Sequence, residues 1–134
     1  GDLIWLMLFV IKKMEKEIVV VIAHRLGKGQ NVAKGVEAAG GKAIVVPGMA
    51  ADMKLGDVMK ENNATFGISF CVSGGAWSIM AQTKYGYKAT SHLRSVEAGV
   101  TAIKQGYQVV GFGFLDTEEL GRRLVEEYKR VNGL

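Results

Sequence analysis

Cysteine, proline and histidine are all scarce in this chain of 134 residues, which has one, one and two of them. A single cysteine cannot form a disulfide within the chain, so the sequence fits a reducing, cytoplasmic setting. One cysteine and two histidines that lie far apart make no recognisable zinc pattern. The G-x-S-x-G segment of a serine-hydrolase nucleophile elbow is also missing. We therefore predict neither a metal site nor another cofactor.

A strong charge of one sign is lacking as well. The 17 lysines and arginines exceed the 13 aspartates and glutamates, for a net charge of +4, and they are scattered along the chain. No nucleic-acid-binding motif accompanies them. A scattered excess of this kind usually solvates a surface, and it can also surround a small anionic ligand. We therefore predict a small anionic ligand and no nucleic acid as the partner.

Long apolar runs are absent apart from the segment Leu3–Ile11. This run is too short to span a bilayer, which takes about 20 residues, so the chain is predicted not to be membrane-spanning. It also lacks the basic start and the small-residue cleavage site of a signal peptide. We interpret residues 1–13 as an apolar arm, either native or added by an upstream start site. Such an arm must be buried somewhere, and a subunit interface in a homo-oligomer is the natural place.

Residues 14–134 alternate between apolar runs typical of buried strands and segments with helical spacing. The predicted strands are 18–23, 42–46, 66–70, 87–89 and 107–112, and the predicted helices are 30–39, 50–61, 75–84, 91–104 and 116–131. In the last helix, Asp116 and Glu119 have the spacing of a capping box, with Asp116 as N-cap. The alternation predicts a single three-layer α/β/α domain with a mostly parallel, Rossmann-like sheet of about five strands.

The loop after the strand 66–70 contains Cys71, Ser73, Gly74 and Gly75. Ligands of open α/β sheets bind beyond the carboxyl ends of the strands, where this loop is expected. The two glycines let backbone N–H groups approach an anion, and the N-terminus of the following helix favours negative charge. The same field would favour the thiolate of Cys71. The alternative is that Cys71 only packs in the interior, as free cysteines often do.

The loop after the first strand offers His24, Arg25 and Lys28. The histidine is a candidate general acid or base, and the two cations are candidates for holding a phosphate. His92 is expected to begin the helix 91–104 and to face the same cleft. The alternative for all four is an ordinary role as solvated or locally hydrogen-bonded residues.

The segment from Ser69 to Ala76 resembles a family of small bacterial proteins that is marked by a glycine-rich SFCGSGGAGA segment. Val72 and Trp77 replace two glycines of that motif. The resemblance covers residues 14–134, and it implies a link to sugar-acid metabolism and a partner associated with a transporter.

The segment from Gly67 to Gly75 is more distantly similar to ribose-5-phosphate isomerase B and its galactose-6-phosphate relatives. That resemblance implies that Cys71 is the base that moves a proton between adjacent carbons of a sugar phosphate. It also implies that Ser73, Gly74 and Gly75 line the loop that holds the enediolate oxygens. His24 and His92 lie near the positions of the two histidines of those enzymes.

A third resemblance is to the cysteine-phosphorylated IIB subunits of sugar phosphotransferase systems, although their cysteine follows the first strand. Together these features predict a protein that binds a sugar phosphate or sugar acid at the Cys71 loop, with isomerase-like proton transfer. The alternative is a non-catalytic binding subunit or a cysteine-phosphorylated carrier that serves a sugar transport system. Whether the protein is an enzyme stays open at this point.

Overall fold

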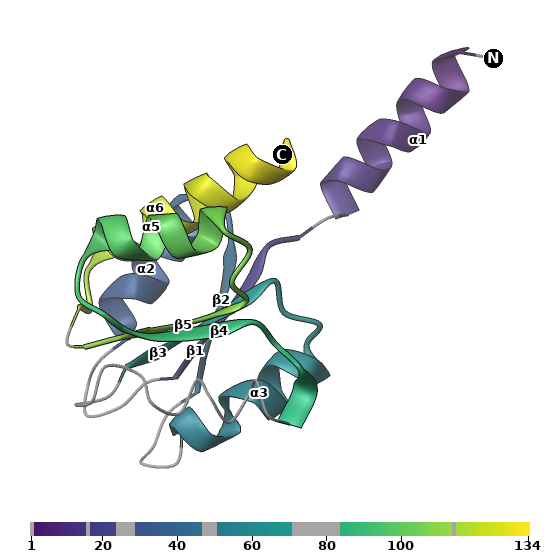
Figure 1. Ribbon diagram of the computed structural model, residues 1–134. Coiled ribbons are helices and arrows are strands. Elements are labelled where there is room, and N and C mark those ends of the chain that lie inside the picture. The colour runs from purple at the N-terminus through teal and green to yellow at the C-terminus, as the bar shows by residue number, and fades with distance from the viewer. Residues whose placement is uncertain (1, 16, 24–28, 47–50, 71–83, 114) are drawn as a thin grey trace.

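The computed structural model describes residues 2–15, 17–23, 29–46, 51–70, 84–113 and 115–134, with side chains for all of these except 9–15 and 51–53. Its strands are β1 (Val19–Ala23), β2 (Lys42–Val46), β3 (Phe66–Phe70), β4 (Ala89–Leu93) and β5 (Val109–Phe112). Its labelled helices are α1 (Asp2–Glu15), α2 (Gln30–Ala38), α3 (Ala51–Glu61), α5 (Val96–Lys104) and α6 (Glu118–Asn132) (Figure 1).

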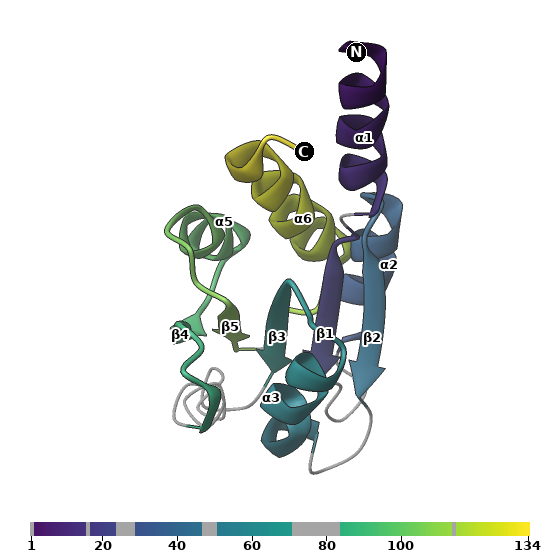
Figure 2. The ribbon, with the colours of Figure 1, turned by 90° about the vertical axis from the view of Figure 1, so that its right-hand side faces the viewer.

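The strands form one five-stranded sheet in the order β2-β1-β3-β5-β4. Every pair of neighbouring strands is parallel. Helices α2, α5 and α6 cover one face of the sheet, and α3 lies on the opposite face (Figure 2). The predicted three-layer α/β/α class with a parallel sheet of about five strands is therefore confirmed.

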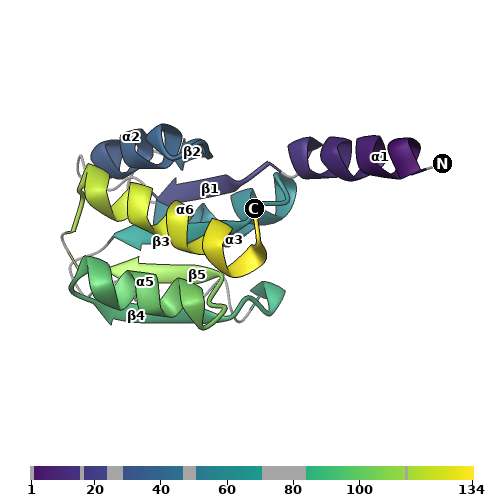
Figure 3. The same cartoon turned by 90° about the horizontal axis from the view of Figure 1, so that it is seen from above.

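The face under α2, α5 and α6, called the three-helix face below, contains the larger part of the core. Seen from above, these helices lie side by side over the strands (Figure 3). The rings of Phe70 and Phe112 have centroids 6.3 Å apart, and both side chains are fully buried. The predicted apolar stripe of α6 supplies Leu120 and Leu124, which are also fully buried. Burial of each such side chain stabilises the fold by about 1.5–3 kcal/mol.

Helices α2 and α6 pack with their backbones in direct contact. A Cβ atom added to Gly35 of α2 would lie 1.9 Å from the carbonyl oxygen of Glu118, and one added to Gly121 of α6 would lie 2.1 Å from that of Val32. No real Cβ atom tolerates such a distance to a backbone atom. Each helix therefore needs a glycine at the crossing point.

Helix α3 fills part of the opposite face, called the α3 face below. Leu55 and Met59 of α3 pack on Val21 of β1 and Val109 of β5. The sulfur of Met59 lies 2.5 Å from where a Cβ atom of Gly67 would stand. Glycine in β3 therefore lets α3 lie close to the sheet.

Several predicted element boundaries are wrong. The last strand, for example, begins at Val109 rather than at residue 107. The expected short strand 87–89 begins at Ala89 instead and continues as β4 to Leu93. Helix α5 begins at Val96 rather than at residue 91, because the hydroxyl of Ser95 accepts the N–H of Ala98 at 3.1 Å and caps the helix there. Helix α6 is capped by Thr117, not by Asp116. The predicted helix 75–84 lies outside the described residues except at its end, where residues 84 and 85 are helical.

Helix α1 extends away from the rest of the molecule (Figure 1). Its described apolar side chains, from Leu3 to Leu8, have exposed fractions between 51% and 75%. Among the described residues, no helix has the length and apolar character needed to cross a membrane. The arm is thus a helix whose apolar surface lacks cover within the described part of the chain.

Candidate functional site

The sheet changes its direction of winding between β1 and β3. The chain leaves β1, passes through α2 and returns as β2 on one side of β1, whereas after β3 it continues to β4 and β5 on the other side. Such a switch point leaves a crevice beyond the carboxyl ends of the two central strands, where ligands of open α/β sheets bind. The register places Ala23, the last residue of β1, beside Ser69.

Most of the predicted site residues follow directly from these two strand ends. The segments that leave β1 and β3 begin at residues 24 and 71, and neighbouring strands lie about 4.8 Å apart. The predicted residues that lie outside the described ranges are His24, Arg25, Lys28, Cys71, Ser73, Gly74 and Gly75. Their predicted roles therefore stay predictions.

His92 is the predicted site residue that the structure describes. It does not begin a helix as expected, because it belongs to the edge strand β4. Its φ of 64° is left-handed, and the register of β4 on β5 is irregular between Thr90 and Leu93. Its exposed side chain has Nδ1 2.8 Å from the hydroxyl oxygen of Ser91. Since β5 separates β4 from β3, His92 lies about 10 Å across the sheet from the end of β3.

Three small residues lie side by side on the α3 face near the carboxyl ends of the central strands. Ala23, Ser69 and Gly111 are register partners on β1, β3 and β5, and all three are buried. The hydroxyl of Ser69 is fully enclosed and has no hydrogen-bond partner among the described residues. Sequence reasoning missed Ser69, because a strand pattern gives no sign that one hydroxyl within it lacks a hydrogen-bond partner.

The start of α2, which also lies at this edge of the sheet, is occupied by a carboxylate. Asp116 accepts the backbone N–H of Val32 at 3.0 Å through Oδ1, and the side-chain amide of Asn31 lies 3.4 Å from Oδ2. Gly29 at the N-cap position makes no side-chain cap of its own. The aspartate predicted to cap its own helix therefore caps a helix 84 residues earlier. Because that negative charge already lies at the helix N-terminus, a second anion gains less there.

A charged cluster ties α3 to the segment before β4. Asp57 Oδ1 accepts hydrogen bonds from Lys84 at 2.7 Å and from the hydroxyl of Tyr85. The bond from Lys84, and then that from Tyr85, hold the pKa of Asp57 below its ordinary value. The bond to Asp57 also raises the pKa of Tyr85. The cluster is open to solvent, so we interpret it as a surface interaction that holds the two segments together and not as a catalytic group.

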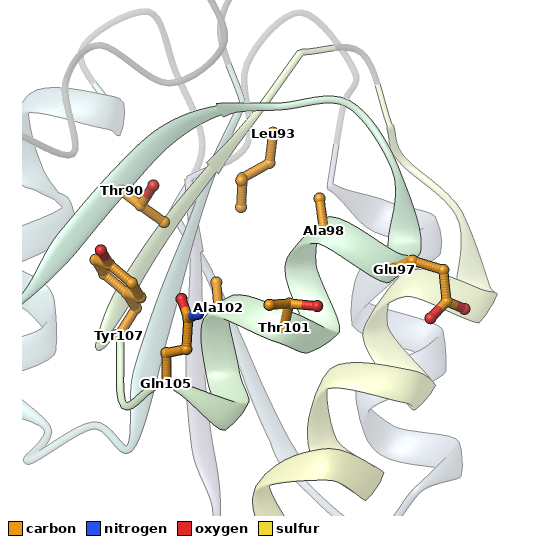
Figure 4. A pocket seen from close by; sticks show the side chains of 8 residues that line it. All are labelled: Thr90, Leu93, Glu97, Ala98, Thr101, Ala102, Gln105 and Tyr107. Carbon is orange, nitrogen blue, oxygen red and sulfur yellow. The ribbon is translucent and has the colours of Figure 1, made fainter.

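A cavity of about 380 Å³ lies between the edge strand β4 and helix α5 (Figure 4). Its walls are mainly apolar, with Leu93, Ala98 and the ring of Tyr107 among them. Its charged lining residue, Glu97, is paired with Arg123 at 2.6 Å. None of the described residues that line it is cationic, so the lining offers a phosphate no positively charged side chain. The described residues also contain no group of three His, Cys, Asp or Glu side chains that could hold a metal ion.

The comparisons with known proteins fit this architecture. The profile of a family described as glycine-rich SFCGS matches residues 18–131. No protein with a curated description matches the sequence. Among solved structures, the type B ribose 5-phosphate isomerase of Trypanosoma brucei is similar with a TM-score of 0.63 and 17% identity, over 87% of this chain and 95% of that one.

Two further isomerase structures show the same likeness. Ribose-5-phosphate isomerase B from Mycoplasma genitalium, with bound ribulose-5-phosphate, has a TM-score of 0.63 at 12% identity, over 84% of this chain and 83% of that one. Ribose-5-phosphate isomerase B from Giardia lamblia has a TM-score of 0.63 at 17% identity, over 83% and 93%. At this identity the likeness concerns the fold.

Proposed function

We propose that this chain, which belongs to the glycine-rich SFCGS family, binds a sugar phosphate or a sugar acid at the crevice between β1 and β3 and transfers a proton through Cys71. The observation that most supports this proposal is the pairing of Ala23 with Ser69 at the switch point, near the carboxyl ends of β1 and β3. It puts the carboxyl ends of β1 and β3 next to each other, and His24 and Cys71 are the residues that follow these two ends in the sequence. The fold shared with type B isomerases, one of them solved with bound ribulose-5-phosphate, supports the same ligand class.

In the proposed reaction the thiolate of Cys71 takes a proton from the carbon beside the substrate carbonyl. This step leaves an enediolate, whose oxygens are held by the backbone N–H groups from Ser73 to Gly75. The thiol then returns the proton to the adjacent carbon, while a proton moves between the two substrate oxygens. His24 is the candidate that transfers this second proton, because it follows the strand next to β3.

The basic residues Arg25 and Lys28 are the proposed contacts of the ligand's phosphate or carboxylate, and His92 is a weaker candidate. The N-terminus of helix α2 is less suited to this role, because the carboxylate of Asp116 already binds the N–H of Val32 there. The ligand's charge must therefore be balanced by side chains or by the glycine-rich loop. In this proposal, cations close to β1 provide that balance.

Solvent deuterium exchange tests the proposed reaction. Each of a panel of sugar phosphates and sugar acids is incubated with the protein in heavy water, and exchange of substrate C–H is followed by NMR. We expect exchange with at least one substrate, and loss of that exchange in Cys71→Ala. The control Thr65→Val alters the far end of β3 and should leave exchange intact. Exchange that survives in Cys71→Ala contradicts the assigned base.

A cysteine-phosphorylated carrier is the second candidate, favoured by the resemblance to IIB subunits and the implied transporter partner. A carrier would gain about 80 Da on Cys71 from a phosphorylated partner protein, which intact-mass spectrometry detects. It would not exchange substrate C–H with solvent. Absence of both phosphate transfer and exchange leaves a plain binding subunit.

For helix α1 we propose an interface with further copies of the chain. The exposed apolar side chains from Leu3 to Leu8 would each contribute about 1.5–3 kcal/mol if fully buried. A closed symmetric assembly is the usual arrangement for such a contact. Deletion of residues 1–13 should then reduce the assembly's mass in light scattering. Unchanged mass and melting temperature would show that the arm has no such role.

A further inference from the structure

Helix α1 is apolar around its whole circumference in the part with described side chains. The six consecutive residues from Leu3 to Leu8 are 51–75% exposed. Six residues complete more than one helical turn, which takes about 3.6 residues. A helix that is apolar on all sides is normally buried, whereas pairing with one other helix covers only a stripe. The surface that covers α1 therefore has to enclose it on more than one side.

The cavity of about 380 Å³ between β4 and α5 has two walls that could do so (Figure 4). Strand β4 forms one wall and α5 the other, and Leu93, Ala98 and the ring of Tyr107 contribute apolar surface. The carboxylate of Glu97 lies 2.6 Å from the guanidinium of Arg123, so this charge of the lining already has a partner. An apolar side chain can therefore enter the cavity without burying an unpaired charge.

Helix α1 and this cavity lie on opposite sides of the same molecule. Helix α1 lies beyond the end of the sheet near β1 and β2, whereas β4 is the strand at the other edge (Figures 2 and 3). Three strand spacings of about 4.8 Å put β4 about 14 Å from β1. The cavity is therefore not covered by the chain's own α1, and α1 of a second copy is the apolar segment that can enter it.

We propose that α1 of one copy lies along α5 of a second copy and inserts Trp5 into the cavity between β4 and α5. Trp5 is 75% exposed, and tryptophan is enriched among the residues that contribute most to interfaces. Its indole N–H needs an acceptor when buried, and the hydroxyl of Thr101 and the side-chain carbonyl of Gln105 in the lining can accept it. The inference rests on the proposed interface through α1 and names the surface that receives this helix.

Length and charge favour an antiparallel arrangement of α1 on α5. The apolar run Leu3–Ile11 within α1 and the whole of α5 each have nine residues, a length of about 13.5 Å. In the antiparallel direction Asp2, before the run, lies close to Lys104 at the end of α5. In the parallel direction it would lie close to Glu97, a residue of the same charge. Reciprocal exchange of the two α1 helices then gives a closed two-fold dimer.

The test disables the two sides of the contact in separate full-length variants. Trp5→Asp puts a charge on α1, and Thr101→Arg puts a long cationic side chain into the cavity from an exposed position of α5. Native mass spectrometry measures which chains assemble. We expect dimers of the unchanged chain, single chains for each variant alone, and mixed dimers when the two variants are combined. In a mixed dimer the intact α1 of the Thr101→Arg chain enters the intact cavity of the Trp5→Asp chain.

Two further variants show whether the effect belongs to the cavity. Gln105→Arg changes another exposed residue of the lining and should act like Thr101→Arg. The matched control Ala38→Arg adds the same side chain at an exposed position of α2, outside the cavity, and should assemble like the unchanged chain. Circular dichroism checks that each variant is folded.

The outcomes separate this inference from the proposed interface. Loss of assembly in Trp5→Asp, together with full assembly in Thr101→Arg and Gln105→Arg, overturns the cavity as the receiving surface and leaves the interface through α1 intact. Single chains of the unchanged protein overturn both. Mixed dimers that form from two variants, neither of which assembles alone, support the contact between α1 and the cavity.

Discussion

The two faces of the sheet differ most at the carboxyl ends of its central strands. On the three-helix face these ends carry Phe70 and Phe112, whose rings are fully buried against each other. On the α3 face the same strands carry Ser69 and Gly111 at the neighbouring positions. Large apolar side chains there contribute to stability, whereas small ones leave space near the proposed site. Stability therefore depends mainly on the three-helix face of these strands, whereas the small residues on the α3 face leave space for the proposed chemistry.

The glycines of the two faces also differ in the kind of atom that lies close to them. On the three-helix face, Gly35 and Gly121 contact backbone atoms of the facing helix. On the α3 face, Gly67 contacts the sulfur of Met59, near the end of a flexible side chain. Backbone contacts cannot yield without moving a helix, whereas a methionine can change rotamer. The three-helix face should therefore be the more sensitive of the two to added volume.

The largest expected effect is the loss of Phe112, a fully buried residue of the core on the three-helix face. Phe112→Ala should lower the free energy of unfolding by about 3–5 kcal/mol, because it leaves a cavity next to Phe70. Urea denaturation measures this change. The control Phe112→Leu retains most of the volume and should cost clearly less. A cost below about 1 kcal/mol for Phe112→Ala would mean that this face is not the better-packed one.

The next effect compares one added methyl group on each face. Gly121→Ala should cost about 3 kcal/mol or more, because the new Cβ would meet the carbonyl oxygen of Val32. Gly67→Ala should cost about 1 kcal/mol, since Met59 can move aside. Thermal unfolding of the two variants provides the ranking. Equal losses of stability in the two variants would contradict the proposal that the three-helix face is the more rigid of the two.

A smaller effect is expected from the cap of α2. Asp116→Ala removes the acceptor of the Val32 N–H and should lower the free energy of unfolding by about 1 kcal/mol. Asp116→Asn keeps a side-chain oxygen at that place and should cost less. Hydrogen exchange at the amide of Val32 should rise in the alanine variant alone. Unchanged exchange would contradict the cap.

Much of the fold could be predicted because its signals are local. The predicted strands 42–46 and 66–70 have the boundaries that the structure shows. The first is a mainly apolar run between Gly41 and Pro47, and the second lies between the pair Asn62-Asn63 and the glycine-rich segment that begins at Ser73. Strand β4 was misplaced because its sequence, ATSHL, has no apolar run. The helix after it was started too early, because Ser91 and Ser95 are both plausible caps and only Ser95 is used as one.

The features of the candidate site that were missed depend on contacts between distant segments. Asp116 has the local pattern of a cap for α6, but its observed partner lies in α2, and local spacing carries no information about that choice. Ser69 reads as one residue of a buried strand, and its lack of a partner follows only from the arrangement of β1, β3 and α3. The parallel sheet, and with it the shared carboxyl edge of its strands, could be predicted from the sequence; which groups meet at that edge depends on the tertiary structure.

The attachment of α2 at both of its ends has a consequence for how the protein is made. Asp116 binds the start of the helix, and Lys129 donates a hydrogen bond to the carbonyl of Ala39 at its end. These partners lie 84 and 90 residues further along the chain. On the ribosome, α2 therefore emerges long before the carboxylate and the ammonium that match its dipole, and before Gly121 can cover it. The N-terminal half is expected to wait, incompletely folded, until the final helix has been synthesised.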